Sequence, residues 1–163
     1  MTQAGVDIPC CLRRRYSQKN DSLIMDVDIL YDKRILNFLL NCPHENVALV
    51  DPRFKFTGEE VNVFAHKGKI AGLGKKMGDS KSCVGEAIGM YWFSRSTGEK
   101  LAWGLKMMLK KRGGRMEYED VFDSIAKDLS MFPRRIPHLP WIEIDTKEDL
   151  AKAKKVIFPK VGE

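Results

Sequence analysis

The sequence predicts an α/β protein, a Rossmann-like three-layer α/β/α sandwich built around a mixed sheet. Short apolar segments of strand length alternate along the chain with segments in which apolar residues recur at helical spacing. Acidic residues follow two of these strands, and the ends of strands are where open α/β sheets place their functional sites. The length of 163 residues suits one such domain with its own hydrophobic core.

The first half of the chain predicts the order strand, helix, strand and β-ribbon. Residues 1–20 follow neither the strand period nor the helix period, so we treat them as an irregular segment ahead of a folded part at 21–163. Pro43 stops the predicted helix, and Gly68 permits a tight turn in the ribbon. The predicted elements are a strand at 22–30, a helix at 31–41, a strand at 46–50 and a ribbon formed by 61–65 and 69–73.

The second half predicts a strand, two helices, another strand and a last helix. Glycines end the first of these helices, and acids open the second, where the positive end of the helix dipole favours them. Thr146 is placed to cap the last helix. In chain order the elements are a strand at 86–93, helices at 94–111 and 118–129, a strand at 141–145 and a helix after Thr146.

The net charge of +6 and the pI of about 9.1 make nucleic acid a partner to consider. The basic residues are scattered, however, and the only dense runs are at 13–15, 110–112 and 152–155. Two of these runs fall in helical patterns, where a solvated face explains them better than a binding site. Because the sequence also lacks a helix-turn-helix signature, a zinc spacing and an aromatic RNP motif, we do not expect nucleic acid as a partner.

Cysteine usage and hydropathy indicate a cytoplasmic protein. The four cysteines, Cys10, Cys11, Cys42 and Cys83, form no CxxC pair and have no metal-ligand spacing, so reduced thiols are expected. No run approaches the roughly 18 apolar residues of a membrane span, and residues 1–20 lack the apolar core of a signal peptide. We therefore expect no membrane partner.

Asp28 and Asp145 share one placement, because each stands at the end of an apolar strand, in DVDILYD and WIEIDT respectively. Carboxylates on rigid strand ends suit a hard cation such as Mg²⁺, which takes oxygen ligands and bridges to substrate phosphates. A single acid in such a place more often faces solvent or only begins a loop. For two matching acids, the residues alone leave a metal site and two solvated acids equally open.

Six segments between residues 22 and 157 carry a resemblance: DVDILYDKRIL, VALVDPRF, KGKIAGLGKK, GEAIGMYWFS, EYEDVFDSI and LPWIEIDTKEDLAKAKKV. Together they resemble the sugar-phosphate and phosphocholine nucleotidyltransferases, which are similar in fold to the molybdenum-cofactor nucleotidyltransferases. GEAIGMYWFS and WIEIDTKEDL are the most specific. The resemblance implies transfer of a nucleoside monophosphate from an NTP, often CTP, to a small phosphorylated alcohol, sugar or phosphonate, with release of pyrophosphate.

The same resemblance implies a metal site and a contact to the acceptor. Asp28 and Asp145 match the family's acids and would hold Mg²⁺, with Glu143 as a further ligand. Lys75 stands where the family has a glycine-lysine after the ribbon, and it would contact a phosphate of the acceptor. A solvated loop lysine is an equally good interpretation of Lys75.

Further acids and aromatics are implied on the acceptor side, because family members that accept amine-bearing monoesters enclose the cation with acids and an aromatic. Charge complementarity at a helix N-terminus explains the acids at 117 and 119 more simply. A tryptophan at the start of a strand would close the pocket, although it is more often a core residue. The candidate acceptor-binding residues are Glu86, Glu117, Tyr118, Glu119 and Trp141.

The chain departs from the family in lacking the strand and glycine-rich loop that hold the triphosphate. Its segment Ala4-Gly5-Val6-Asp7 has no second glycine and no basic residue at the right distance, so we expect the usual N-terminal strands to be missing from the sheet. A truncated product, half of a split protein and a noncatalytic or degenerate interaction module all remain compatible with this pattern. A homodimer or a partner polypeptide would complete the sheet, and the sequence leaves open whether the chain alone is an enzyme.

Overall fold

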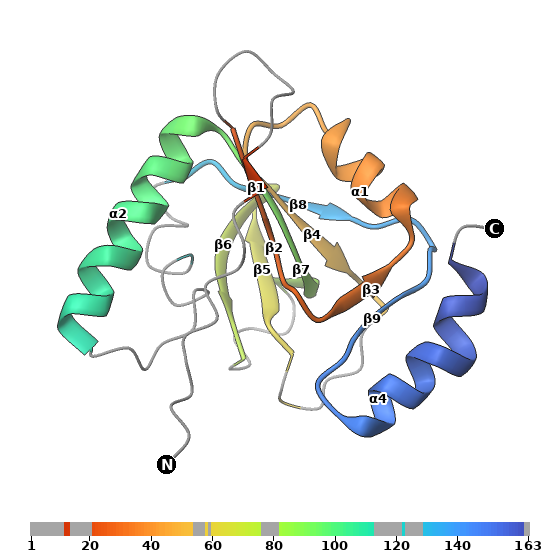
Figure 1. Ribbon diagram of the computed structural model, residues 1–163. Helices are drawn as coiled ribbons and strands as arrows, with labels where there is room; N and C mark the ends of the chain where they lie inside the picture. The colour runs from red at the N-terminus through yellow and green to blue at the C-terminus, as the bar shows by residue number, and fades with distance from the viewer. Residues whose placement is uncertain are drawn as a thin grey trace.

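The described part of the chain forms a seven-stranded sheet, a separate two-stranded sheet and flanking helices (Figure 1). The computed structural model describes residues 12–13, 21–53, 58, 60–75, 82–112, 122 and 129–161. The strands are β1 (Leu12–Arg13), β2 (Ser22–Met25), β3 (Ile29–Tyr31), β4 (Val47–Asp51), β5 (Asn62–His66), β6 (Lys69–Gly74), β7 (Cys83–Phe93), β8 (Phe132–Arg135) and β9 (Trp141–Glu143). The helices are α1 (Lys33–Leu40), α2 (Arg95–Arg112) and α4 (Lys147–Lys152), which continues as a π-helical turn (Ala153–Ile157) and a 3-10 turn (Phe158–Lys160).

Strand β7 organises the main sheet, whose order is β1-β2-β7-β4-β8, with the ribbon of β5 and β6 joined to the first part of β7. Strands β2 and β4 both run antiparallel to β7, and β8 runs parallel to β4. The carboxyl ends of β2, β4 and β8 therefore lie at one edge of the sheet, which is also where β7 begins. This mixed sheet with its helices confirms the predicted α/β fold class.

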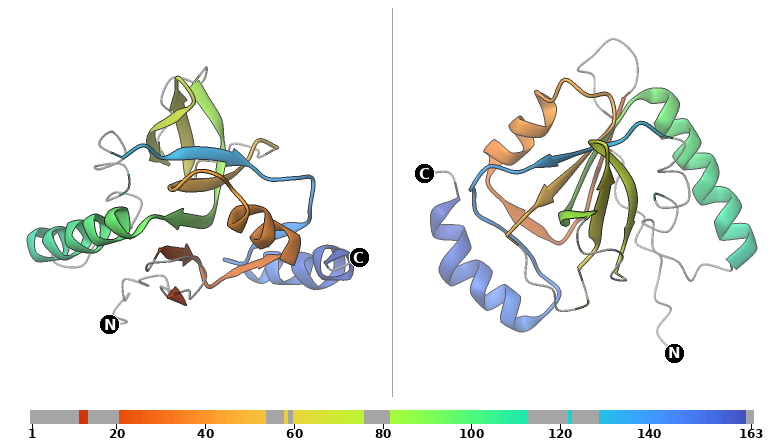
Figure 2. Two further views of the ribbon diagram at one scale, coloured as in Figure 1. Left: turned by 90° about the horizontal axis from the view of Figure 1, so that it is seen from above. Right: turned by 180° about the vertical axis from the view of Figure 1, so that it is seen from behind.

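Helices cover both faces of the main sheet, as the views from above and from behind show (Figure 2). Strand β4 is buried along its whole length, and its residues alternate between two hydrophobic cores. Val47 and Leu49 pack in the core that α1 closes, whereas Ala48 and Val50 pack in the core that α2 closes. The two-residue period of a strand thus gives each face of the sheet its own helix, and three layers result.

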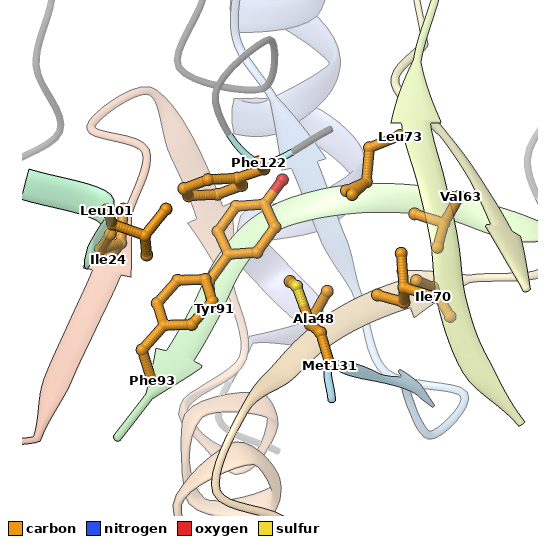
Figure 3. Close-up of a cluster of buried hydrophobic side chains, with 11 residues drawn as sticks. Ile24, Ala48, Val63, Ile70, Leu73, Tyr91, Phe93, Leu101, Phe122 and Met131 are labelled. Carbon is orange, nitrogen blue, oxygen red and sulfur yellow. The ribbon is translucent and has the colours of Figure 1, made fainter. Parts of the chain in front are cut away.

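An aromatic cluster fills the core on the α2 side of the sheet (Figure 3). The ring of Phe122 meets the rings of Tyr91 and Phe93 edge to face, at centroid separations of 4.8 and 5.3 Å. All three side chains are almost completely buried. Edge-to-face packing is a favourable arrangement of aromatic rings, so this cluster holds the second half of β7 against the α2 layer.

Capping side chains fix the first residues of helices α1 and α4. The side chain of Asp32 accepts a hydrogen bond from the amide of Arg34 and caps α1, and Thr146 forms a full capping box with Asp149 at the start of α4. Thr146 therefore has the capping role that the sequence predicts. None of the helices in the described part of the chain combines the length and the apolar character needed to cross a membrane.

The structure departs from the predicted elements at three places. The segment 22–30, predicted as one strand, divides into β2 in the main sheet and β3 in the two-stranded sheet. The acids in DVD and the largely exposed Val27 between them have no core to enter, so the chain leaves the main sheet there. Strand β8 was not predicted from the sequence, because Pro133 and two arginines interrupt its apolar pattern. Strand β1 lies within the segment 1–20 that was expected to be irregular, and most of the helix predicted at 118–129 lies outside the described residues.

Candidate functional site

Three acidic side chains from distant parts of the sequence meet near the carboxyl edge of the main sheet. Asp28 lies between β2 and β3, Glu143 ends β9, and Asp145 lies two residues further on. One carboxylate oxygen from each residue lies within 4.8 Å of the others, and all three residues are exposed. We call Asp28, Glu143 and Asp145 the carboxylate cluster. An ion or a small solute can reach all three side chains from solvent.

The pairing of β3 with β9 brings the carboxylate cluster together. Ile29 stands opposite Glu143 in the antiparallel register, and the amide of Ile144 donates to the carbonyl of Asp28 over 2.9 Å. Asp28 therefore lies beside the segment that carries Glu143 and Asp145. The sequence pattern placed Asp28 and Asp145 at the ends of strands in one sheet, whereas the structure gathers them, with Glu143, along the small second sheet.

Like charges surround the carboxyl group of Glu143. Burial of this group raises the pKa of Glu143 to about 7, and the charges of Asp145, Asp28, Asp26 and Glu86 add to the rise. Glu143 as a whole residue is exposed, whereas its carboxyl group is partly shielded from solvent by neighbouring protein atoms. A bound cation would relieve the repulsion among these groups.

The carboxylate cluster also fits Mg²⁺ by size. Two oxygen ligands of an octahedral Mg²⁺ stand about 3.0 Å apart when adjacent and about 4.2 Å apart when opposite, because each lies about 2.1 Å from the ion. The three oxygens of the cluster all lie within 4.8 Å of one another, and their exposed side chains can rotate to reach these spacings. Oxygen ligands from carboxylates are what this hard cation prefers. The residues present are therefore a suitable donor set for Mg²⁺.

Gly89 makes room for a fourth acid, Asp26, beside the cluster. Strand β7 has an irregularity opposite Ala48 and Val50, and Gly89 within it has a φ of +69°. The amide of Asp26 donates to the carbonyl of Gly89 over 2.9 Å. A Cβ atom at position 89 would collide with the carboxylate of Asp26. Glycine is therefore required here both by its backbone conformation and by the acid packed against it.

Gly89→Ala is expected to lower the free energy of unfolding by about 2 to 3 kcal/mol, because alanine is strained at positive φ and also pushes Asp26 aside. Urea unfolding followed by circular dichroism measures the change. In an Asp26→Ala background the same substitution should cost less, because the colliding carboxylate is gone. Equal costs in the two backgrounds would contradict the packing of Asp26 against Gly89.

Glu86 extends the acidic region toward β4 and β5. In the main sheet Glu86 pairs with Asp51 on one side and with Asn62 on the other. Burial raises the pKa of Glu86 to about 7, and the charges of Glu60 and Asp51 add to the rise. Because the charge of Glu86 also raises the pKa of Glu143, the two carboxyl groups interact across this edge of the sheet.

Glu86→Gln is expected to stabilise the protein above neutral pH. The native pKa of Glu86, about 7, exceeds the ordinary value of 4.5, so the native state binds more protons than the unfolded state between these pH values and stability falls as the pH rises. The penalty is complete above pH 7 and absent below pH 4.5. Glutamine removes it, and the expected gain at about pH 8 is on the order of 1 to 2 kcal/mol, less than the full pKa shift corresponds to, because solvent screens this partly exposed carboxylate.

Urea unfolding of Glu86→Gln and the wild type at about pH 4.5 and about pH 8 measures this difference. Glu45→Gln, the same change at an exposed acid, serves as the matched control and should show no such gain. A Glu86→Gln protein whose stability keeps the pH dependence of the wild type would contradict the expected result.

Asp51, to which the sequence analysis gave no role, is the centre of a buried hydrogen-bond network at the end of β4. It is 6% exposed, and its Oδ1 accepts from the amide and from Nε of Arg53. Its Oδ2 accepts from Nη2 of Arg53 at 2.8 Å and from Nε1 of Trp141 at 2.7 Å. Burial opposes the ionisation of Asp51, but the hydrogen bonds from Arg53 and Trp141 outweigh it and lower its pKa. Its position at the carboxyl end of a strand, like that of the acids already singled out, was the one available signal.

Trp141 lies at the margin of the α1-side core rather than fully within it. It pairs with Tyr31 across the small sheet, and its ring packs partly buried against that core. Its indole N–H is directed at Asp51. A role for Trp141 toward an acceptor stays a prediction, and the structure gives it a definite partner in the protein.

Lys75 lies at the same end of the main sheet as Glu86. It directly follows β6, whose last residue Gly74 pairs with Asn62, and Asn62 pairs with Glu86 on its other side. The side chain of Lys75 is exposed. Its contact with an acceptor phosphate stays a prediction. The remaining candidates, Glu117, Tyr118 and Glu119, lie outside the described residues.

Three solved nucleotidyltransferase structures are similar to this fold. The inositol-1-phosphate CTP transferase of T. maritima matches with a TM-score of 0.62 and 15% sequence identity, over 87% of this chain and 59% of that one. A putative glucose-1-phosphate thymidylyltransferase of Bacillus anthracis matches with 0.59 and 16%, over 82% and 52%. The CTP:phosphocholine cytidylyltransferase of Streptococcus pneumoniae matches with 0.59 and 15%, over 82% and 56%.

These likenesses concern the fold, because the sequence identities are only 15 to 16%. No family model matches the sequence. The chain covers between 52% and 59% of the three similar proteins, so it corresponds to little more than half of each. Over most of its own length, this chain therefore has the α/β fold seen in nucleotidyltransferases.

Proposed function

We propose that this chain forms the metal-binding and acceptor-binding part of a nucleotidyltransferase. The reaction joins a nucleoside monophosphate from an NTP to a small phosphorylated alcohol, sugar or phosphonate and releases pyrophosphate. The observation that carries the proposal is the convergence of Asp28, Glu143 and Asp145 within 4.8 Å. CTP is the first nucleotide to consider, because two of the three similar structures are named as enzymes that use CTP.

The chemistry of this reaction suits a site made of charges rather than of a protein nucleophile. An oxygen of the monoester attacks the α-phosphorus of the NTP, and the bond from that phosphorus to pyrophosphate breaks in line with it. Catalysis then consists of positioning two anionic substrates and neutralising the charge between them. A bound Mg²⁺ would supply that neutralisation.

Each candidate residue in the described part of the chain has a proposed part in this reaction. Asp28, Glu143 and Asp145 hold the divalent ion, as their converging oxygens support. Lys75 contacts the phosphate of the acceptor, supported by its place on the same sheet end as Glu86. Glu86 and Trp141 border the acceptor as well, supported by the charge interaction of Glu86 with Glu143 and by the place of Trp141 on the strand that carries Glu143.

The NTP requires a further binding element. Ahead of the strand that begins at Ser22, the sequence has no strand followed by a glycine-rich loop with a basic residue of the kind that cradles a triphosphate. We therefore propose that a partner polypeptide or a further segment completes the nucleotide site. The coverage of 52% to 59% of the three similar proteins supports this part of the proposal.

Release of pyrophosphate tests the proposed function. The chain is incubated with CTP, Mg²⁺ and a panel of monoesters that includes phosphocholine, inositol 1-phosphate, glucose 1-phosphate and a phosphonate. The assay is run on the chain alone and with a polypeptide that carries a glycine-rich nucleotide loop. Release that requires both Mg²⁺ and one monoester supports the proposal. Binding of a monoester without turnover under every condition would favour the alternative, a noncatalytic module that keeps the fold.

A further inference from the structure

The carboxylate cluster stands on a small sheet that cannot fix its own position. Strands β3 and β9 pair over three residues each, and among the described residues neither strand pairs with the main sheet. A two-stranded sheet of this size is at best marginally stable in isolation. The place of Glu143 and Asp145 relative to the main sheet therefore depends on other contacts that attach β9.

A polar contact joins β9 directly to the main sheet. Trp141 at the start of β9 donates its indole N–H to Oδ2 of Asp51 over 2.7 Å. Asp51 is a fixed acceptor, because it is buried at the end of β4 and receives three further hydrogen bonds from Arg53. Trp141 and Glu143 are two residues apart on the strand, so their side chains leave the same face of β9. The contact that orients Trp141 thereby orients Glu143.

Apolar contacts also bury residues of β9, but they do not fix the orientation of this strand relative to the main sheet. Ile142 on the opposite face of β9 is 8% exposed, and Trp141 packs against the α1-side core. Apolar burial favours contact without specifying distance or orientation. A hydrogen bond to an ionised acceptor specifies both, and it is stronger than one between neutral groups. The contact between Asp51 and Trp141 is therefore suited to set the position of β9.

We propose that Asp51 and Trp141 are positioning residues, which hold β9, and with it the carboxylate cluster, in place against the main sheet. They act through the backbone of β9. The effect on binding of a divalent ion rests on the proposed function. The attachment of β9 to the main sheet does not depend on it. The two parts are tested separately.

The attachment of β9 is tested by Trp141→Phe, which keeps an aromatic ring and removes the N–H donor. Trp103→Phe, at a tryptophan that is 66% exposed on α2, is the matched control. Amide hydrogen exchange is measured without metal at β9 and at Ile144, whose amide donates to Asp28. Exchange there should become about 10-fold faster in Trp141→Phe, because loss of the hydrogen bond makes local opening of β9 more frequent. Exchange in the Trp103→Phe control should not change.

Exchange in β7 reports on the main sheet and should stay as in the wild type, which shows that the variant is folded. Asp51→Asn is the second variant, because an asparagine offers one oxygen where the native carboxylate serves both Arg53 and Trp141. It should also speed exchange at β9 and Ile144. Unchanged exchange in both variants would overturn the inference.

Affinity for Mn²⁺, followed by electron paramagnetic resonance, tests the consequence for the carboxylate cluster. Trp141→Phe is expected to weaken Mn²⁺ binding by about 10-fold, as loss of groups that orient metal ligands commonly does, and Trp103→Phe should leave it unchanged. Faster exchange with wild-type Mn²⁺ affinity would overturn the link from β9 to the cluster. A wild-type protein that binds no Mn²⁺ would instead count against the metal site of the proposed function, and the exchange result would still decide the attachment of β9.

Discussion

Asp145→Asn is expected to reduce both the affinity for Mn²⁺ and the rate of pyrophosphate release by about 100-fold or more. Asp145 contributes one of the three converging carboxylates, and an amide in its place offers a neutral, weaker ligand. The change also removes one of the charges that raise the pKa of Glu143. Mn²⁺ binding is measured on the chain alone, and pyrophosphate release is measured with the polypeptide that supplies the nucleotide loop.

The matched control for this prediction lies three residues further along the chain. Glu148→Gln makes the same change from acid to amide at an exposed position in the first turn of α4. It should leave Mn²⁺ affinity close to the wild-type value, whereas Asp28→Asn should behave like Asp145→Asn. If Asp145→Asn and Glu148→Gln bound Mn²⁺ equally well, the carboxylate cluster would not be a metal site.

Gly85→Ala is expected to lower the free energy of unfolding by about 3 kcal/mol or more. Gly85 has a φ of +150°, and a Cβ atom there would lie 2.6 Å from the carbonyl oxygen of Asp51 and 2.9 Å from its carbonyl carbon. Both are backbone atoms, so no side-chain rotation relieves the collision. Strands β4 and β7 would have to separate beside Glu86. Urea unfolding followed by circular dichroism measures the loss.

Gly74→Ala provides the comparison for Gly85→Ala. Gly74 ends β6, and a Cβ atom at this position meets nothing within 4 Å. Alanine here should be neutral, or stabilising by up to about 1 kcal/mol, because it restricts the unfolded chain. Similar losses for the two variants would mean that the close approach of β7 to Asp51 is not what makes Gly85 necessary.

Features that depend on neighbouring residues were predictable from the sequence. The capping box of Thr146 with Asp149 needs a spacing of three residues, and it forms as expected. The ribbon turns at Lys67 and Gly68, both at positive φ, where the sequence predicts a glycine turn. The aromatic strand at 86–93 is found as the second part of β7. The cap and the turn are stabilised by contacts within a few residues, and the strand is indicated by its run of apolar and aromatic residues, so the pattern of side chains is enough to reveal them.

The division of the segment 22–30 was not predictable in this way. Its apolar residues suit a strand throughout, but Ser22–Met25 pair with β7 in the main sheet and Ile29–Tyr31 pair with β9. Which partner each part takes depends on segments more than 60 residues further along the chain. A period of two shows that a segment is extended, and it does not show which strand lies beside it.

The sequence by itself determined the α/β class, the order of most elements and the acids that end up in the carboxylate cluster. Only the tertiary structure decided that these acids share a small second sheet and that Asp26 packs on Gly89. It also decided that Asp51 accepts a hydrogen bond from Trp141, 90 residues away in the sequence. The physical reason is the range of the interactions concerned. Propensity and capping act over a turn or two of chain, whereas burial, repulsion between carboxyl groups and a hydrogen bond between two sheets exist only after distant segments have packed together.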